Sequence, residues 1–197
     1  MTPDPNSERR SERARRAILD AAFDLVSRKG FAKVTIEAIA AQAGVGKPTI
    51  YRWWRSKGAV VLEAMNEVIG DDVGFPDTGD IAADLTTQIT AVTDLITGRI
   101  GEVYKGVLSE AQNDPTLMKA FREAVLDPSI AECRARLDSA VAAGQLRSDV
   151  PTDVMVDLFY APIHYRYFLG FGVDEVRRSA ELVPDVLLGL RPRPDAG

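Results

Sequence analysis

The sequence predicts an all-helical protein, with a small N-terminal helix-turn-helix module followed by a larger helical domain. Three observations predict this fold. Apolar residues recur at intervals of three and four along most of the chain, which is the period of an amphipathic helix. No segment alternates apolar and polar residues in the way a half-buried strand does. Glycine and proline stand between the periodic segments, where helices end.

Capping residues and apolar spacing predict the helices of the N-terminal module. A first helix begins near Ser11 and ends at Gly30, after a basic last turn. Thr35 caps a second short helix that Gly44 terminates, and Ser56 caps a fourth. The predicted helices are 11–29, 35–43, 47–54 and 56–68.

Six further helical patterns follow a glycine- and aspartate-rich segment at 70–79. They cover 81–97, 102–113, 116–125, 129–143, 152–169 and 174–190. We therefore divide the chain into a flexible N-terminal arm, a helix-turn-helix domain, a helical domain and a loose C-terminal tail. Their predicted bounds are 1–8, 9–69, 80–190 and 191–197.

The composition is that of a globular protein, with 46% hydrophobic and 27% charged residues. No apolar run approaches the roughly 18–20 residues that span a bilayer, and the N-terminus lacks a secretory pattern, so we expect a cytoplasmic protein with no membrane partner. Cys133 is the one cysteine, which excludes an internal disulfide and a multi-cysteine zinc site. We expect no metal and no cofactor.

The net charge of −5 is unevenly distributed. Residues 1–60 hold 12 Lys/Arg against 6 Asp/Glu, a net +6, and residues 61–197 hold 12 against 23, a net −11. This asymmetry favours a phosphate-facing head on a body that repels nucleic acid, although solvated charges can cluster in this way without any function.

The segment Thr35 to Lys57, TIEAIAAQAGVGKPTIYRWWRSK, has the pattern of two short helices joined by a glycine turn. Ala40 is small where the helices cross, Gly44 supplies a positive φ, and Ile50 buries the inner face of the second helix. Such a second helix presents side chains to base edges in the major groove, while flanking cations and hydroxyls hold phosphates.

Residues from about Arg9 to Met65 resemble the DNA-binding domain of the tetracycline repressor (TetR) family of bacterial regulators. Phe31 and Thr35 match the turn into the second helix, and Ala43-Gly44-Val45 match the turn of the motif. Thr49-Ile50-Tyr51, Trp54 and Ser56-Lys57 match the recognition helix and its exit. Gly46 departs from the pattern, because the family often has a capping Ser or Thr there, which puts a hydroxyl–phosphate contact in doubt.

The predicted DNA-binding residues lie in or beside this motif. Tyr51 and Lys57 are phosphate candidates by the resemblance, and Thr35 is one at a helix N-terminus. Trp54 matches a buried aromatic of the family, whereas Trp53 should point outward. The whole set is Thr35, Lys47, Pro48, Thr49, Tyr51, Arg52, Trp53 and Lys57.

The five arginines between positions 9 and 16 have two readings. They form either an element that reaches DNA phosphates or a minor groove, or a solvated helix face. The residues are Arg9, Arg10, Arg13, Arg15 and Arg16.

The resemblance also implies a C-terminal domain that dimerises and binds a small molecule. The apolar content of 152–169 and 174–190 suits a bundle shared by two subunits, and burial within one subunit is the alternative. Pro162 should kink its helix, which opens a pocket or shapes an interface. Cys133 is expected in the core, and His164 is the one histidine. The predicted ligand-binding residues are Tyr104, Phe121, His164, Tyr165 and Phe168.

These patterns predict a dimeric DNA-binding regulator, most simply a repressor that a small-molecule effector releases from a palindromic double-stranded operator. A dimeric DNA-binding protein without an effector is the first alternative. An enzyme or carrier is the second, and it is disfavoured because no nucleophile with a base, no phosphate loop and no persuasive carboxylate pair is found.

Overall fold

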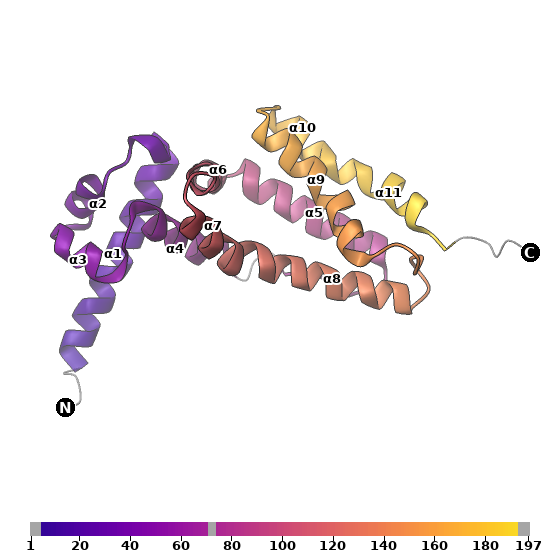
Figure 1. Ribbon diagram of the computed structural model, residues 1–197, viewed down its shortest axis with the longest axis horizontal. Coiled ribbons are helices and arrows are strands. Elements are labelled where there is room, and N and C mark those ends of the chain that lie inside the picture. The colour runs from indigo at the N-terminus through magenta and orange to yellow at the C-terminus, as the bar shows by residue number, and fades with distance from the viewer. Residues whose placement is uncertain (1–4, 71–73, 193–197) are drawn as a thin grey trace, which may run out of the picture. The chain divides into compact units, whose positions relative to one another are not determined.

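The computed structural model describes residues 5–70 and 74–192, and within those ranges it contains helices and turns and no strand. The all-helical prediction is therefore confirmed (Figure 1). The α-helices are α1 (Pro5–Lys29), α2 (Ile36–Ala43), α3 (Lys47–Trp53), α4 (Lys57–Ile69), α5 (Ile81–Thr97), α6 (Gly101–Ala111), α7 (Pro115–Phe121), α8 (Asp127–Ala142), α9 (Thr152–Phe168), α10 (Val173–Arg177) and α11 (Val183–Leu190).

Several helices begin where a short polar side chain accepts a hydrogen bond from the first turn. The Thr35 hydroxyl accepts from the Ala38 amide at 3.2 Å, and the Ser56 hydroxyl accepts from the Ala59 amide at 3.2 Å. Asp80 caps α5 and Asp114 caps α7 through their carboxylates. Each cap satisfies a backbone donor that has no partner inside the helix, which explains why these starts could be predicted locally.

One compact unit comprises the described residues up to Gly70 together with Arg99–Ala124. In it α1 packs against α2, α4 and α6, and α4 packs against α6 and α7. Its apolar centre is formed by fully buried side chains from these helices and from α3, among them Ile18, Val26, Ile39, Ile50, Val61, Met65, Val103 and Val107.

The second compact unit comprises 74–98 and 125–192 of the described residues. Its helices α5, α8, α9, α10 and α11 enclose a separate apolar core. Large buried side chains in that core include Leu85, Ile89, Leu137, Met155, Phe159, Ile163 and Leu187.

The division into two compact units does not coincide with the boundary that the sequence suggests near residue 80. Helices α6 and α7, which follow α5 in the chain, pack in the same unit as α1 and α4. Glycine permits this packing at two places, because a Cβ on Gly106 would lie 2.5 Å from Phe31 Cβ and one on Gly58 would lie 2.7 Å from a Leu117 methyl. The division into functional domains at 9–69 and 80–190 stays a prediction.

Three helical patterns differ from expectation. Helix α1 begins at Pro5, so residues 5–8 are helical where an arm was predicted, while residues 1–4 lie outside the described residues.

The patterns predicted as separate helices at 116–125 and 129–143 are continuous. A π-helical turn, Arg122–Leu126, joins α7 directly to α8, and Pro128 stands in the first turn of α8, where a missing N–H is tolerated.

The pattern predicted as one helix over 174–190 is divided into α10, a 3₁₀ segment Arg178–Leu182, and α11. Pro184 lies in the first turn of α11. Proline cannot donate a backbone hydrogen bond and its ring collides with the preceding turn, so a continuous α-helix cannot pass through this position without distortion. Of the predicted tail, residues 193–197 lie outside the described residues.

Among the helices of the described residues, none is both long enough and apolar enough to cross a membrane.

Candidate nucleic-acid interface

The corner between α2 and α3 is built on Gly44, whose backbone is left-handed with φ 67° and ψ 31°. The Gly44 amide donates to the Ala41 carbonyl at 3.3 Å, and the Val45 amide donates to the Ala40 carbonyl at 3.0 Å. This is the Schellman arrangement that closes a helix at a glycine. Ala40 and Ile50 are buried, which confirms the inward position predicted for Ile50, and the backbone of Gly44 confirms its predicted positive φ.

Helix α3 starts after an extended Gly46 that offers no side-chain cap, with Pro48 in its first turn. The Lys47 ammonium at the same helix start donates to Glu37 of α2 at 3.0 Å. This hydrogen bond raises the pKa of Lys47 and lowers the pKa of Glu37. Both side chains are exposed, so the ion pair with Glu37 is weak. Lys47 therefore still presents a positive charge on the outer face of the corner.

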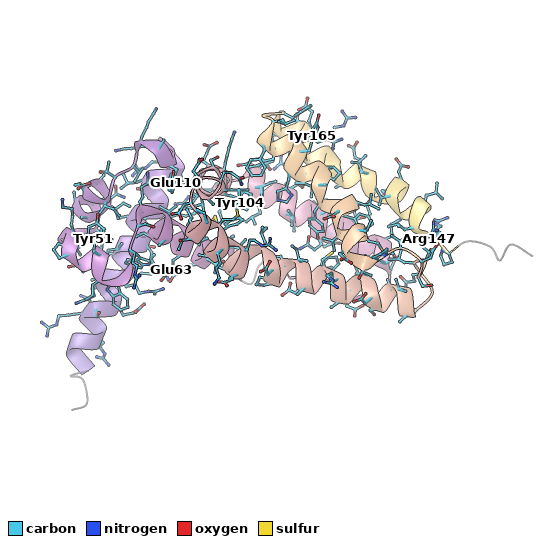
Figure 2. All side chains as sticks on the ribbon, in the orientation of Figure 1. Tyr51, Glu63, Tyr104, Glu110, Arg147 and Tyr165 are labelled. Carbon is cyan, nitrogen blue, oxygen red and sulfur yellow. The ribbon has the colours of Figure 1, made fainter. Side chains whose placement is uncertain are left out.

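The outer face of α3 is exposed and rich in hydrogen-bond donors. Tyr51 and Trp53 are 52% and 43% exposed, which is unusual for large aromatic side chains. The Arg52 guanidinium lies 5.6 Å from the Trp53 ring centroid and donates to the Ser11 hydroxyl at 3.4 Å. Figure 2 shows Tyr51 on the outer side of this helix. The other predicted residues here are exposed Lys47 and Pro48 and half-buried Thr49.

Trp54 is only 4% exposed, which confirms the prediction that it is buried while Trp53 points outward. Its indole N–H donates to Glu63 Oε2 of α4 at 2.6 Å. The same carboxylate accepts from Arg15 of α1, whose Nε lies 3.0 Å from Glu63 Oε1. One carboxylate therefore holds the end of α3 to both α1 and α4.

Glu63 and Arg15 were not among the predicted site residues. Glu63 is separated from Trp54 by nine positions and from Arg15 by 48. No local spacing rule connects residues at such separations, so the sequence carries no signal for this network.

Lys57, a predicted phosphate candidate, has an internal partner. Its ammonium donates to the Phe31 carbonyl at 2.9 Å and lies 4.0 Å from the Phe31 ring centroid. Partial burial lowers the pKa of Lys57. An ammonium has three donors, and the Phe31 carbonyl uses one of them. Thr35, the other candidate at a helix start, is exposed, and its hydroxyl oxygen accepts the capping hydrogen bond of α2.

The arginines near the start of α1 are of two kinds. Arg15 contacts Glu12, Glu63 and Glu67, and its hydrogen bond to Glu63 raises the guanidinium pKa. Arg16 pairs with Asp20 at 3.5 Å and Glu67 at 3.2 Å. The side chains of Arg9, Arg10 and Arg13 are exposed.

The five predicted ligand-binding residues fall in both units. Tyr104 and Phe121 are buried in the first unit with ring centroids 5.6 Å apart, and burial raises the pKa of Tyr104 to about 12. His164 and Phe168 stack at 6.1 Å in the second unit. Tyr165 is 60% exposed and contacts Phe171, so it does not line the interior of its own unit (Figure 2). The ligand-binding assignment stays a prediction.

The second unit also buries polar groups that sequence reasoning missed. Asp84 of α5 and Arg136 of α8 are 1% and 5% exposed, and Arg136 Nε donates to Asp84 Oδ2 at 2.8 Å. Desolvation alone would raise the pKa of Asp84, but hydrogen bonds from Thr78 and Arg136 lower it overall. The Tyr160 hydroxyl donates to Gln88 Oε1 at 2.9 Å.

Cys133 is buried in the apolar core, as expected, and burial raises the pKa of its thiol to about 11. Across residues 5–70 and 74–192, no group of three or more His, Cys, Asp or Glu side chains is arranged to hold a metal ion.

Two family models match this chain. Residues 18–64, which contain the Gly44 corner, match the model of the bacterial regulatory proteins of the tetR family. Residues 75–188 match the model of the tetracyclin repressor-like C-terminal domain. Together they cover most of both units.

Known proteins resemble the chain over nearly its full length. The HTH-type transcriptional regulator YdeS of Bacillus subtilis strain 168 is 36% identical over 184 residues, covering 92% of each chain. The DNA-binding transcriptional repressor TetR of Mycobacteroides abscessus is 29% identical over 184 residues, covering 92% of this chain and 95% of the relative.

Among solved structures, the TetR family transcription regulator SCO0332 aligns with a TM-score of 0.69 at 32% identity, covering 88% of this chain and 97% of that chain. The regulator FadR of Bacillus subtilis, solved in complex with stearoyl-CoA, aligns with a TM-score of 0.69 at 18% identity, covering 89% and 98%. At that identity the second likeness concerns the fold alone.

Proposed function

The chain belongs to the TetR family of DNA-binding transcriptional regulators, and from that premise we propose that it is a homodimeric repressor that a small-molecule effector releases from a palindromic operator. The family is one of transcription regulators and not of enzymes. The observation that carries the proposal is the exposed, cation-bearing outer face of α3 on the Gly44 corner.

The side chains of this face divide by chemistry. Lys47 and Thr49 stand in the first turn of α3, and recognition helices read base edges from that end. Pro48 and Trp53 offer apolar surface to the groove, and Arg52 offers a guanidinium group that can donate two parallel hydrogen bonds. Tyr51, Thr35 and Lys57 would hold phosphates, with Lys57 sharing its ammonium between Phe31 and the DNA backbone.

A homodimer is supported by an exposed apolar stripe on α9. Leu158, Tyr165 and Leu169 follow Val154 by four, eleven and fifteen positions, which places all four on one side of a helix. Leu188 of α11 is also exposed. Monomeric proteins rarely leave such a surface in water, and two copies of α9 and α11 would cover it as a helical bundle.

Not all apolar residues of the segments expected to pair, 152–169 and 174–190, are free for a partner. Val154 and Leu158 are exposed as a partner contact requires, whereas Ile163, Val176 and Leu190 are buried within the subunit. In a two-fold dimer the recognition helices would meet half-sites about 34–36 Å apart, one helical turn of DNA.

An effector is supported by the fold and by the buried polar groups of the second unit. FadR, which shares the fold, was solved with stearoyl-CoA. In the present chain the Tyr160–Gln88 pair and the stacked His164 and Phe168 supply hydrogen-bonding and aromatic groups beside an apolar core. An effector releases DNA when it binds the DNA-incompetent conformation more tightly.

The direct test is fluorescence anisotropy with a labelled duplex taken from upstream of the protein's own coding sequence, followed by a screen of small molecules for release. We expect Tyr51→Phe to weaken binding to all duplexes and Lys47→Met or Thr49→Val to change which sequence is preferred. Arg134→Gln, an exposed position of α8, is the control and should bind as the wild type does.

Equal affinity of the wild type and all three α3 variants for every duplex would refute the assignment of α3. Specific DNA binding that no compound releases would leave a dimeric regulator without an effector.

For the dimer, Leu158→Asp combined with Leu188→Asp should halve the mass in light scattering and abolish operator binding. A wild-type protein that is monomeric at micromolar concentration would refute dimerisation.

A further inference from the structure

Glu37 is the one acidic residue between Thr35 and Lys57, a segment that carries four Lys and Arg residues. It stands in the first turn of α2, where a carboxylate stabilises the helix through the helix dipole. Its side chain is exposed on the outer face of the corner. A carboxylate on a surface that faces DNA phosphates costs affinity through charge repulsion. Stabilisation of α2 alone therefore does not account for an acid on this surface.

Glu37 and Lys47 place a negative and a positive group side by side where α2 meets α3. The Lys47 Nζ atom lies 3.0 Å from Glu37 Oε1. An ammonium has three donors and a carboxylate about four acceptor sites, so this contact leaves capacity on both groups. Exposed pairs of this kind are weak. Both groups can therefore bind a further polar partner at the same time.

The major-groove edge of a G·C base pair offers the complementary arrangement. Guanine presents the acceptors N7 and O6, and cytosine presents the N4–H donor. A hydrogen bond joins O6 to N4 within the base pair, so these two atoms are about 2.9 Å apart. The separation of Lys47 Nζ and Glu37 Oε1 is nearly the same. With the ammonium at guanine and the carboxylate at cytosine, each charged group meets a base atom of opposite polarity.

An A·T base pair fits the same two side chains less well. Across its edge stand the adenine N7 acceptor, the adenine N6 donor, the thymine O4 acceptor and the thymine methyl group. A carboxylate at N6 would lie beside the N7 acceptor, and an ammonium at O4 would lie beside the methyl group. At a G·C pair the ammonium instead meets two neighbouring acceptors. The ion pair therefore favours G·C.

We infer that Glu37 is a specificity-determining residue that, together with Lys47, reads one G·C base pair in each half-site. Lys47 donates to guanine O6 and N7, and Glu37 accepts from cytosine N4–H. The inference rests on the proposed DNA-binding function and extends base reading from α3 to α2. Ten positions separate the two residues, so no local spacing in the sequence indicated that Glu37 belongs to this surface.

Replacing base pairs one at a time tests this inference. The wild type first selects a duplex from a random pool, and each G·C pair of one half-site is then changed to A·T in turn. We expect one of these changes to weaken wild-type binding by about tenfold or more. Glu37→Met keeps the length of the side chain and its helix propensity but has neither the charge nor a strong acceptor. In this variant the loss at that position should fall below about threefold, with the other positions unchanged.

A modified base examines the cytosine contact itself. N4-methylcytosine keeps Watson–Crick pairing but carries a methyl group in place of the N–H that faces the groove. At the position found above it should weaken the wild type and leave Glu37→Met unaffected. Because the variant also loses a negative charge, we expect it to bind an unrelated duplex at low salt at least as tightly as the wild type does.

The matched control is Glu123→Met. Glu123 is an exposed glutamate whose carboxylate lies 3.7 Å from the Lys119 ammonium, outside the α2–α3 corner. Its response to every base-pair change should equal that of the wild type. Thermal unfolding of both variants shows whether the fold is retained.

A wild-type response of Glu37→Met at every base pair would overturn the inference while leaving DNA reading by α3 intact. An equal loss of affinity at all positions would also overturn it, because that pattern indicates that Glu37 only stabilises α2. Failure of the wild type to select any duplex would instead refute the proposed function.

Discussion

The indole N–H of Trp54 donates a 2.6 Å hydrogen bond to Glu63, which joins the residue that ends α3 to the middle of α4. Trp54 is buried and its acceptor is a carboxylate, a combination that makes hydrogen bonds stronger than average. Because Glu63 also holds Arg15, the orientation of the recognition helix depends on a carboxylate that is not itself among the DNA-facing residues.

A double-mutant cycle tests this coupling. Trp54→Phe removes the donor and Glu63→Gln removes the charge, and we expect the pair to show a coupling energy of about 1–2 kcal/mol in urea unfolding. The cycle of Trp53→Phe with Glu63→Gln should give a value near zero, since Trp53 is exposed and does not contact Glu63. A coupling near zero in both cycles would show that the hydrogen bond does not hold α3.

The backbone of Gly44 makes a second prediction. Its φ of 67° is unfavourable for an L side chain, although a Cβ there would meet no atom within 4 Å. Gly44→Ala should therefore destabilise the protein by about 1–2 kcal/mol through backbone strain alone.

Gly46 provides the matched control for that change. Its φ is −80° and it stands at the N-cap of α3 without a side-chain hydrogen bond. Gly46→Ser should be neutral or add a few tenths of a kcal/mol. Equal effects of the two substitutions in thermal unfolding would contradict the left-handed turn.

The buried pair Asp84 and Arg136 makes a third prediction. Arg136→Leu leaves a desolvated carboxylate without its cation and should cost about 3–5 kcal/mol. Arg178→Ala, which breaks the exposed pair with Glu181, should cost less than about 1 kcal/mol. Adding Asp84→Leu to Arg136→Leu should recover much of the loss, because the uncompensated charge is removed. A cost below about 1 kcal/mol in Arg136→Leu would show that the pair is not buried as described.

The same pair predicts a dependence on pH. The pKa of Asp84 in the folded protein is below its ordinary value of 3.8. Its contribution to the free energy of unfolding is therefore complete above that value and is lost as pH falls through the folded pKa. Unfolding in urea should show the wild type losing stability over this acidic range more steeply than Asp84→Leu/Arg136→Leu does.

Gly106 supplies a fourth prediction. A Cβ at this position would lie 2.5 Å from Phe31 Cβ and would displace the residue that holds Lys57. Gly106→Ala should destabilise the protein by about 1–3 kcal/mol in urea unfolding and weaken DNA binding. Gly189→Ala, with nothing within 4 Å of its Cβ, should be neutral or stabilising, since alanine favours a helix by about 1 kcal/mol. Wild-type stability in Gly106→Ala would contradict the close packing of α6 on Phe31.

The amino-acid sequence alone was sufficient for the features that arise within about one helical turn. The Thr35 and Ser56 caps and the Gly44 turn were predicted because each depends on backbone hydrogen bonds among near neighbours. The opposite exposures of Trp53 and Trp54 were predicted from the family resemblance. The family resemblance rested on the same short segment.

Tertiary structure decided the contacts between distant residues. The Trp54–Glu63–Arg15 network, the buried Asp84–Arg136 pair and the packing of α6 on Phe31 join positions far apart in the chain. Which faces meet depends on how whole helices pack, and a polar side chain carries no local mark of the partner it will find. For the same reason the sequence did not show that Arg15 and Arg16 pair with the carboxylates of α4, which lie about 50 positions further along the chain.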